Sequence, residues 1–110
     1  MGSGRVGVSI STQRHDRVVT VGVAGEIDLA AGPMLEDGIL TGLQDPDVDA
    51  VLVDLAAVTF LDSSGISVLL KGRRAAERRG CSFRVVGADG IVRTVLDLTG
   101  VWPLLSSESD

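Results

Sequence analysis

The chain has 110 residues, and its hydrophobic content of 45% is enough for the core of one domain but not of two. Fifteen Asp and Glu residues against ten Lys and Arg residues give a net charge of -5, which disfavours binding to nucleic acid and to anionic membrane surfaces. With one cysteine and one histidine, the chain can form neither an intramolecular disulfide nor a zinc site.

The hydropathy pattern bears on location. No apolar run approaches the ~20 residues that a membrane span needs. Residues 1–5 also lack the apolar core of a signal peptide. We therefore expect a cytoplasmic protein without a membrane partner.

The first predicted elements form a hairpin. Apolar residues alternate with small or polar ones over residues 6–11, which is typical of a half-buried strand, and the polar residues 13–16 predict a turn. A second strand follows over residues 18–24. The sequence then predicts a helix over residues 31–43, in which Gly38 and Gly42 indicate either close packing on a sheet or a shorter helix.

The second half alternates strands and helices. Residues 51–55 are almost continuously apolar, which favours a central strand covered on both faces. A helix is predicted over residues 63–79, with Gly80 as a left-handed cap. Three shorter elements follow: a strand over 83–86, a helix over 91–98 that ends at Gly100, and an edge strand over 101–105.

These elements predict the fold class α/β: a single domain over residues 5–106 with a mixed β-sheet, an N-terminal hairpin and helices packed on the sheet, followed by a loose tail at 107–110. Right-handed crossovers place the carboxyl ends of the parallel strands and the helix N-termini on one rim. Asp28 and the turn at Asp62 would share this rim.

Catalytic constellations are scarce in the sequence. His15 lies in a polar turn away from the predicted rim, so no nucleophile and base pair is expected. The glycine-rich phosphate motifs are missing despite 14 glycines. We therefore predict no enzyme activity, no catalytic residue, no cofactor and no metal.

Two other features have competing interpretations. The basic cluster Lys71, Arg73, Arg74, Arg78 and Arg79 is either an anion-binding patch or a solvated helix face whose charge complements the helix dipole. Cys81 is either a redox switch or, as we favour, a small buried apolar residue.

The segment Asp62-Ser63-Ser64-Gly65 follows the central strand and opens the longest predicted helix. In one interpretation, Asp or Ser simply caps the helix and Gly65 relieves crowding. In the other, the exposed Ser63 hydroxyl is a phosphorylation site, because the helix dipole and free amides tolerate a phosphate there.

The segment Phe60-Leu61-Asp62-Ser63-Ser64-Gly65, together with Gly25-Glu26-Ile27-Asp28 and the order of elements, resembles STAS domains of the bacterial anti-sigma factor antagonists. The resemblance runs from about residue 6 to residue 105. It implies that Ser63 is phosphorylated by a partner that is both a serine kinase and an anti-sigma factor. It also places Asp28, Asp62, Ser64 and Gly65 with Ser63 in or near the partner interface.

The resemblance implies partner switching: the unphosphorylated chain binds the kinase and frees the sigma factor, phosphorylation of Ser63 abolishes binding, and a phosphatase restores it. The family usually has a further C-terminal helix, which we expect to be truncated or very short here. One alternative is an unregulated STAS adaptor or scaffold module in a transport or signalling complex. Another is a phosphoaspartate receiver using Asp54, although the acidic pair that holds magnesium is missing.

Overall fold

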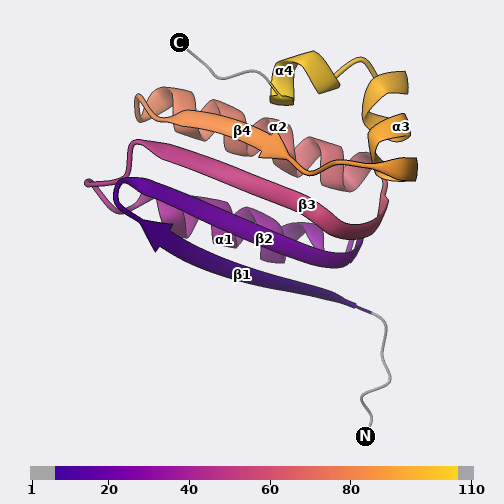
Figure 1. The fold of residues 1–110 in the computed structure, drawn as a ribbon, viewed down its shortest axis with the longest axis horizontal. Coiled ribbons are helices and arrows are strands. Elements are labelled where there is room, and N and C mark those ends of the chain that lie inside the picture. The colour runs from indigo at the N-terminus through magenta and orange to yellow at the C-terminus, as the bar shows by residue number, and fades with distance from the viewer. Residues whose placement is uncertain (1–6, 107–110) are drawn as a thin grey trace, which may run out of the picture.

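The computed structural model describes residues 7–106, which form a four-stranded mixed sheet with the strand order β1-β2-β3-β4 (Figure 1). The strands are β1 (Val8–His15), β2 (Val18–Ile27), β3 (Ala50–Leu61) and β4 (Ser82–Val86). The helices are α1 (Gly32–Leu43), α2 (Ser63–Arg78), α3 (Gly90–Leu98) and α4 (Trp102–Ser106). The first two strands are antiparallel, and β3 and β4 extend the sheet in parallel. The predicted α/β class and mixed sheet are confirmed.

Helices α1 and α2 pack side by side on one face of the sheet, whereas α3 and α4 lie near the β4 edge (Figure 1). The core lies between the sheet and α1 and α2, where Val21, Leu35, Ile39 and Phe83 are fully buried. Gly42 lets α1 approach the sheet closely, because an added Cβ would lie 3.1 Å from Val19 Cγ1. The predicted close packing of α1 is therefore confirmed.

The hairpin differs from its prediction. We expected a turn over residues 13–16, but β1 continues through His15, which pairs with Val18. Only Asp16 and Arg17 remain to connect the strands, and Asp16 takes a φ of 54°. Asp tolerates this left-handed conformation better than most residues. Pairing with β2 therefore overrides the polar composition that suggested a longer turn.

The central strand β3 is longer than predicted and is not covered on both faces. Its inward residues Val51, Val53 and Leu55 are buried, whereas Leu52 and Asp54 are only half-buried. The reason is that α1 and α2 pack on the same face of the sheet. An apolar run alone did not distinguish a strand covered on one face from one covered on two.

The predicted edge strand at 101–105 is wrong, because this segment forms the short helix α4. Pro103 has no N–H for a strand ladder but fits the first turn of a helix. Leu105 is fully buried and anchors α4 beside β4, while the Arg93 guanidinium lies 4.3 Å from the centre of the Trp102 ring. The predicted loose tail at 107–110 lies outside the described residues.

Strand β2 extends three residues beyond its predicted end at residue 24, to Ile27, whereas the boundaries of α1, α2, β4 and α3 agree with the predictions to within one residue. Helix α2 ends at Arg78, and Gly80 has the predicted left-handed conformation, with a φ of 71°. Within residues 7–106, no helix is long and apolar enough to cross a membrane.

Candidate functional site

The candidate site is the rim where β2 and β3 end. Ile27 and Leu61 pair at the ends of these parallel strands, and the Asp62 amide donates to the Ile27 carbonyl over 3.3 Å. Asp28 directly follows β2 and Asp62 directly follows β3, so both residues lie at the same edge of the sheet. The predicted rim is confirmed in this respect.

Two irregularities in β3 set this alignment. Val19 pairs with Val51 whereas Ile27 pairs with Leu61, so β3 has two more residues than β2 between these pairs. The register shifts at two places, as β-bulges do, and Asp54 Oδ1 accepts a hydrogen bond from the Ala56 amide over 2.9 Å at the first of them. Bulges re-aim a strand locally, and here they bring Leu61 level with Ile27.

Asp62 is the N-cap of α2. Its backbone is extended, and its Oδ1 accepts from the Ser64 amide over 2.9 Å and from the Gly65 amide over 3.3 Å. An N-cap acid satisfies amides that the helix itself leaves without partners. Because Asp62 already occupies these two amides, they are not free to receive a phosphate, contrary to the expectation from the sequence.

Ser63 is the first residue of α2 and is exposed, whereas Ser64 is half-buried. Among the described residues, no hydrogen bond engages the Ser63 hydroxyl. The structure therefore presents this hydroxyl to solvent directly beside the half-buried Asp62 carboxylate.

Asp28 holds the turn into α1. Its Oδ1 accepts from the Ala31 amide over 3.0 Å, and its backbone carbonyl accepts from the Ala31 and Gly32 amides. This half-buried carboxylate therefore fixes the path of the chain that leads from β2 into α1.

Gly65 is buried beneath the rim. A Cβ at this position would lie 2.3 Å from Leu61 Cδ1 and 2.8 Å from Ile27 Cγ2, closer than real Cβ contacts. Its missing side chain allows the first turn of α2 to pack against the ends of both strands. Gly65 therefore shapes the rim from below, while Ser63 lies on its surface.

Exposed apolar side chains that the sequence did not indicate lie around the rim. Leu29 follows Asp28 and is 77% exposed, Phe60 is level with Glu26 on β2 and is 43% exposed, and Met34 on α1 is 49% exposed. Met34 and Asp28 also line one shallow hollow. A leucine between an acidic turn and a helix start is a signal in the sequence for Leu29, and the alternation from Val51, Val53 and Leu55 onward already puts Phe60 on the outward side.

Other chemically reactive residues lie elsewhere. His15 is at the far end of β1, with a 95% exposed side chain, so its predicted distance from the rim is confirmed. Cys81 is buried, as predicted, and its thiol donates to the Val48 carbonyl over 3.3 Å. Within residues 7–106, His, Cys, Asp and Glu form no group of three that could hold a metal ion.

Comparison with known families agrees with this geometry. Residues 9–107 match the model of the STAS domain. The chain belongs to the STAS domain family. The antiparallel β1-β2 hairpin agrees with this family. The observed fold therefore does not support the interpretation of the chain as a receiver that is phosphorylated on Asp54.

Individual relatives extend the comparison. An anti-sigma-B factor antagonist of Staphylococcus epidermidis is 28% identical over 98 residues, which cover 89% of this chain and 90% of the relative. The crystal structure of an anti-sigma factor antagonist from Mycobacterium paratuberculosis superposes with a TM-score of 0.80 and 31% identity, covering 90% of this chain and 83% of that one.

Two more distant structures share the fold. The Bacillus cell fate determinant SpoIIAA in its phosphorylated form has a TM-score of 0.66 and 20% identity, covering 93% of this chain and 92% of that one. The murine anion transporter Slc26a9 contains a similar domain, with a TM-score of 0.68 and 20% identity over 83% of this chain and 15% of that one. The fold therefore occurs both in proteins of this size and as a small part of a transporter.

Proposed function

We propose that this chain is an anti-sigma factor antagonist that acts by partner switching. The unphosphorylated chain binds an anti-sigma factor with serine kinase activity and so releases the sigma factor. Phosphorylation of Ser63 abolishes this binding, and a phosphatase reverses it. The chain supplies only the acceptor hydroxyl, and the partner supplies the catalytic residues and ATP. The names of the relatives in Staphylococcus and Mycobacterium support this assignment.

The observation that carries the proposal is the position of Ser63. It is exposed at the start of α2, and the adjacent Asp62 carboxylate already occupies the Ser64 and Gly65 amides. A phosphate on Ser63 would bring about 1.5–2 negative charges beside this carboxylate. The rim would change from a neutral hydroxyl with one adjacent acid to a strongly anionic surface.

This change is large enough to operate a switch. A buried charge without a matching partner in an interface costs about 2–5 kcal/mol, and ~2.7 kcal/mol corresponds to a hundredfold loss of affinity. A partner surface that fits the Ser63 hydroxyl has no preformed site for the phosphate. We therefore expect phosphorylation to weaken binding by about thirtyfold or more.

The rim also has the apolar surface that a protein partner needs. Leu29, Phe60 and Met34 are large and exposed. Leu29 directly follows Asp28, and Phe60 lies two residues before Asp62. Large exposed apolar side chains near the ends of the strands are available to a protein partner. We place the kinase contact over these side chains and Ser63.

Phosphorylation with ATP and candidate anti-sigma kinases tests the proposal, with the product mapped by mass spectrometry. We expect phosphate on Ser63, none on the Ser63→Ala variant, and normal labelling of the matched Ser64→Ala control. The Ser63→Glu variant should bind the kinase at least about tenfold more weakly than the unmodified chain. Labelling of Ser64 alone, or equal affinity of Ser63→Glu, would contradict the proposal.

The second candidate is an unregulated STAS adaptor or scaffold module. The occurrence of the fold within a transporter favours it, and the exposed apolar rim would then serve a constitutive contact. In that case, a partner isolated with the unmodified chain would bind Ser63→Glu equally well, and no kinase would label the chain.

A further inference from the structure

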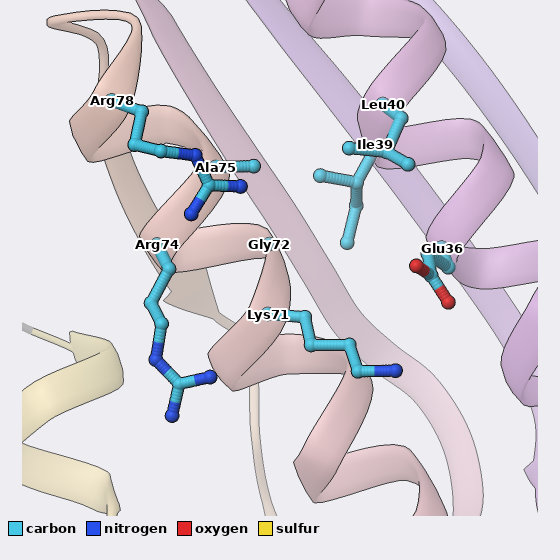
Figure 2. Close-up of a pocket in the computed structure, with 8 residues that line it drawn as sticks. All are labelled: Glu36, Ile39, Leu40, Lys71, Gly72, Arg74, Ala75 and Arg78. Carbon is cyan, nitrogen blue, oxygen red and sulfur yellow. The ribbon is translucent and has the colours of Figure 1, made fainter.

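The surface that the proposed switch leaves unexplained is a groove between α1 and α2. One hollow lies between Glu36 and Leu40 on α1 and Lys71 and Arg74 on α2 (Figure 2). A second hollow continues from it toward the C-terminal ends of both helices, and the two share Leu40, Ala75 and Arg78. Together they form one groove along the helix pair, which we call the α1/α2 groove.

The groove is basic although the chain is acidic. Four of the ten Lys and Arg residues line it, against one carboxylate, that of Glu36. These four are Lys71, Arg74, Arg78 and Arg79. All four are exposed, and among the described residues no hydrogen bond or ion pair neutralises them.

Arg73 does not line the groove. It is the remaining member of the basic cluster and pairs with Glu77 over 3.3 Å, with only 15% of its side chain exposed. The charge of Arg73 is thus balanced by Glu77, whereas the four groove residues have no such partner among the described residues. All four line the hollows between α1 and α2; in Figure 2 the Lys71 side chain extends toward α1, whereas the Arg74 side chain points away from α1.

The floor of the groove is apolar. Ile39 is buried beneath it, Ala75 is buried on α2, and Leu40 is 39% exposed on the α1 side. Gly72 keeps the two helices close, because a Cβ there would lie 3.1 Å from Ile39 Cδ1. The groove thus combines an apolar floor with a basic wall on the α2 side.

The spacing of the cations specifies the shape of the occupant. Lys71, Arg74 and Arg78 stand at i, i+3 and i+7 and span about 10 Å of helix at 1.5 Å per residue. A second helix with carboxylates at the same spacing matches this row, and its apolar side chains would rest on the floor between α1 and α2. We propose that the α1/α2 groove binds an acidic amphipathic helix of a partner protein.

This surface is distinct from the rim. At 1.5 Å per residue, Lys71 lies about 12 Å and Arg78 about 22 Å along α2 from Ser63. The phosphate of the proposed switch is therefore not a direct neighbour of the bound helix. Binding in the groove does not depend on the proposed function and is tested separately from it.

The test uses fluorescence anisotropy with a labelled helical peptide of about 16 residues that carries Glu at i, i+3 and i+7 and Leu at i+4. A scrambled peptide of the same composition and a single-stranded oligonucleotide serve as comparison probes. We expect the helical peptide to bind more tightly than both, and its affinity to fall with added salt because the basic wall is exposed.

Variants locate the binding. The double variant Arg74→Gln/Arg78→Gln should weaken peptide binding by on the order of tenfold, and Leu40→Gln should weaken it as well. Arg93→Gln on α3 is the matched control and should leave the affinity within about twofold. Ser63→Glu should do the same, which separates the groove from the proposed switch. Circular dichroism melts establish that each variant is folded.

Three results would overturn the proposal. These are an affinity of the double variant equal to that of the unmodified chain, equal binding of the helical and scrambled peptides, and tighter binding of the oligonucleotide. The last would assign the groove to nucleic acid instead. Failure of Ser63 phosphorylation would leave the groove proposal unaffected.

Discussion

Replacing Asp62 separates the structural from the electrostatic contribution of the carboxylate beside Ser63. The Ala variant removes the oxygen that accepts from the Ser64 and Gly65 amides, whereas the Asn variant keeps an acceptor of similar size and removes only the charge. Asn and Asp are about equally good N-caps, so Asp62→Asn should retain the start of α2.

The expected magnitude follows from the capping geometry. Loss of an N-cap costs about 0.5–2 kcal/mol of the free energy of unfolding, typically ~1 kcal/mol. Asp62 caps two amides of the longest helix, so we expect about 1–2 kcal/mol for Asp62→Ala. For a domain near 100 residues, this corresponds to a fall in Tm of about 4–10 °C. We expect Asp62→Asn to lie within about 0.5 kcal/mol of the unmodified chain.

Urea unfolding followed by far-ultraviolet circular dichroism measures these differences. Asp89→Ala is the control, because Asp89 caps the shorter α3 and its side chain accepts only from the adjacent Gly90 amide over 2.8 Å. It should cost less than Asp62→Ala. If Asp62→Asn is as destabilised as Asp62→Ala, the charge and not the hydrogen bonding stabilises the first turn, and our reasoning is refuted.

Three further predictions test the packing. Gly65→Ala should lower the free energy of unfolding, measured in urea, by about 1–3 kcal/mol despite the better helix propensity of Ala. An unchanged free energy of unfolding would show that Ile27 and Leu61 can move aside. Leu35→Ala should lower the free energy of unfolding by about 2–5 kcal/mol in the same assay, and a decrease of less than about 1 kcal/mol would contradict the place of Leu35 in the core. The Cys81 thiol should react with a thiol reagent only at the rate of unfolding, so rapid labelling of the native chain would argue against its burial.

The sequence predicted those parts of the fold that depend on local pattern. The period of apolar residues identified α2, and Asp62 at its start supplied a capping signal. The meeting of Asp28 and Asp62 on one rim followed from the handedness of parallel crossovers rather than from any motif.

The parts that were missed depend on contacts between distant segments. The two additional residues in β3 expose Ala57 and bury Val58 before Leu61 returns to the inward side, and nothing in the local sequence marks those bulges. The basic residues of α2 were visible as a cluster, but the packing of α1 beside them determines that four line a groove and that Arg73 does not. In both cases the neighbouring element, and not the local sequence, decides the surface.

Helix α2 can carry a switch because its charges are matched to its ends. Asp62 lies at the positive N-terminal end of the helix dipole and Arg78 at the negative C-terminal end, and each favours the helix by about 0.3–0.5 kcal/mol, the lower part of the usual range. A phosphate on Ser63 would gain from the same N-terminal dipole while being repelled by Asp62, so the two effects oppose each other in the free chain. In a complex, the phosphate would also lose its water, and the described rim residues include no basic side chain that could offset that cost. The proposed modification therefore acts mainly on binding and leaves the fold that presents Ser63 intact.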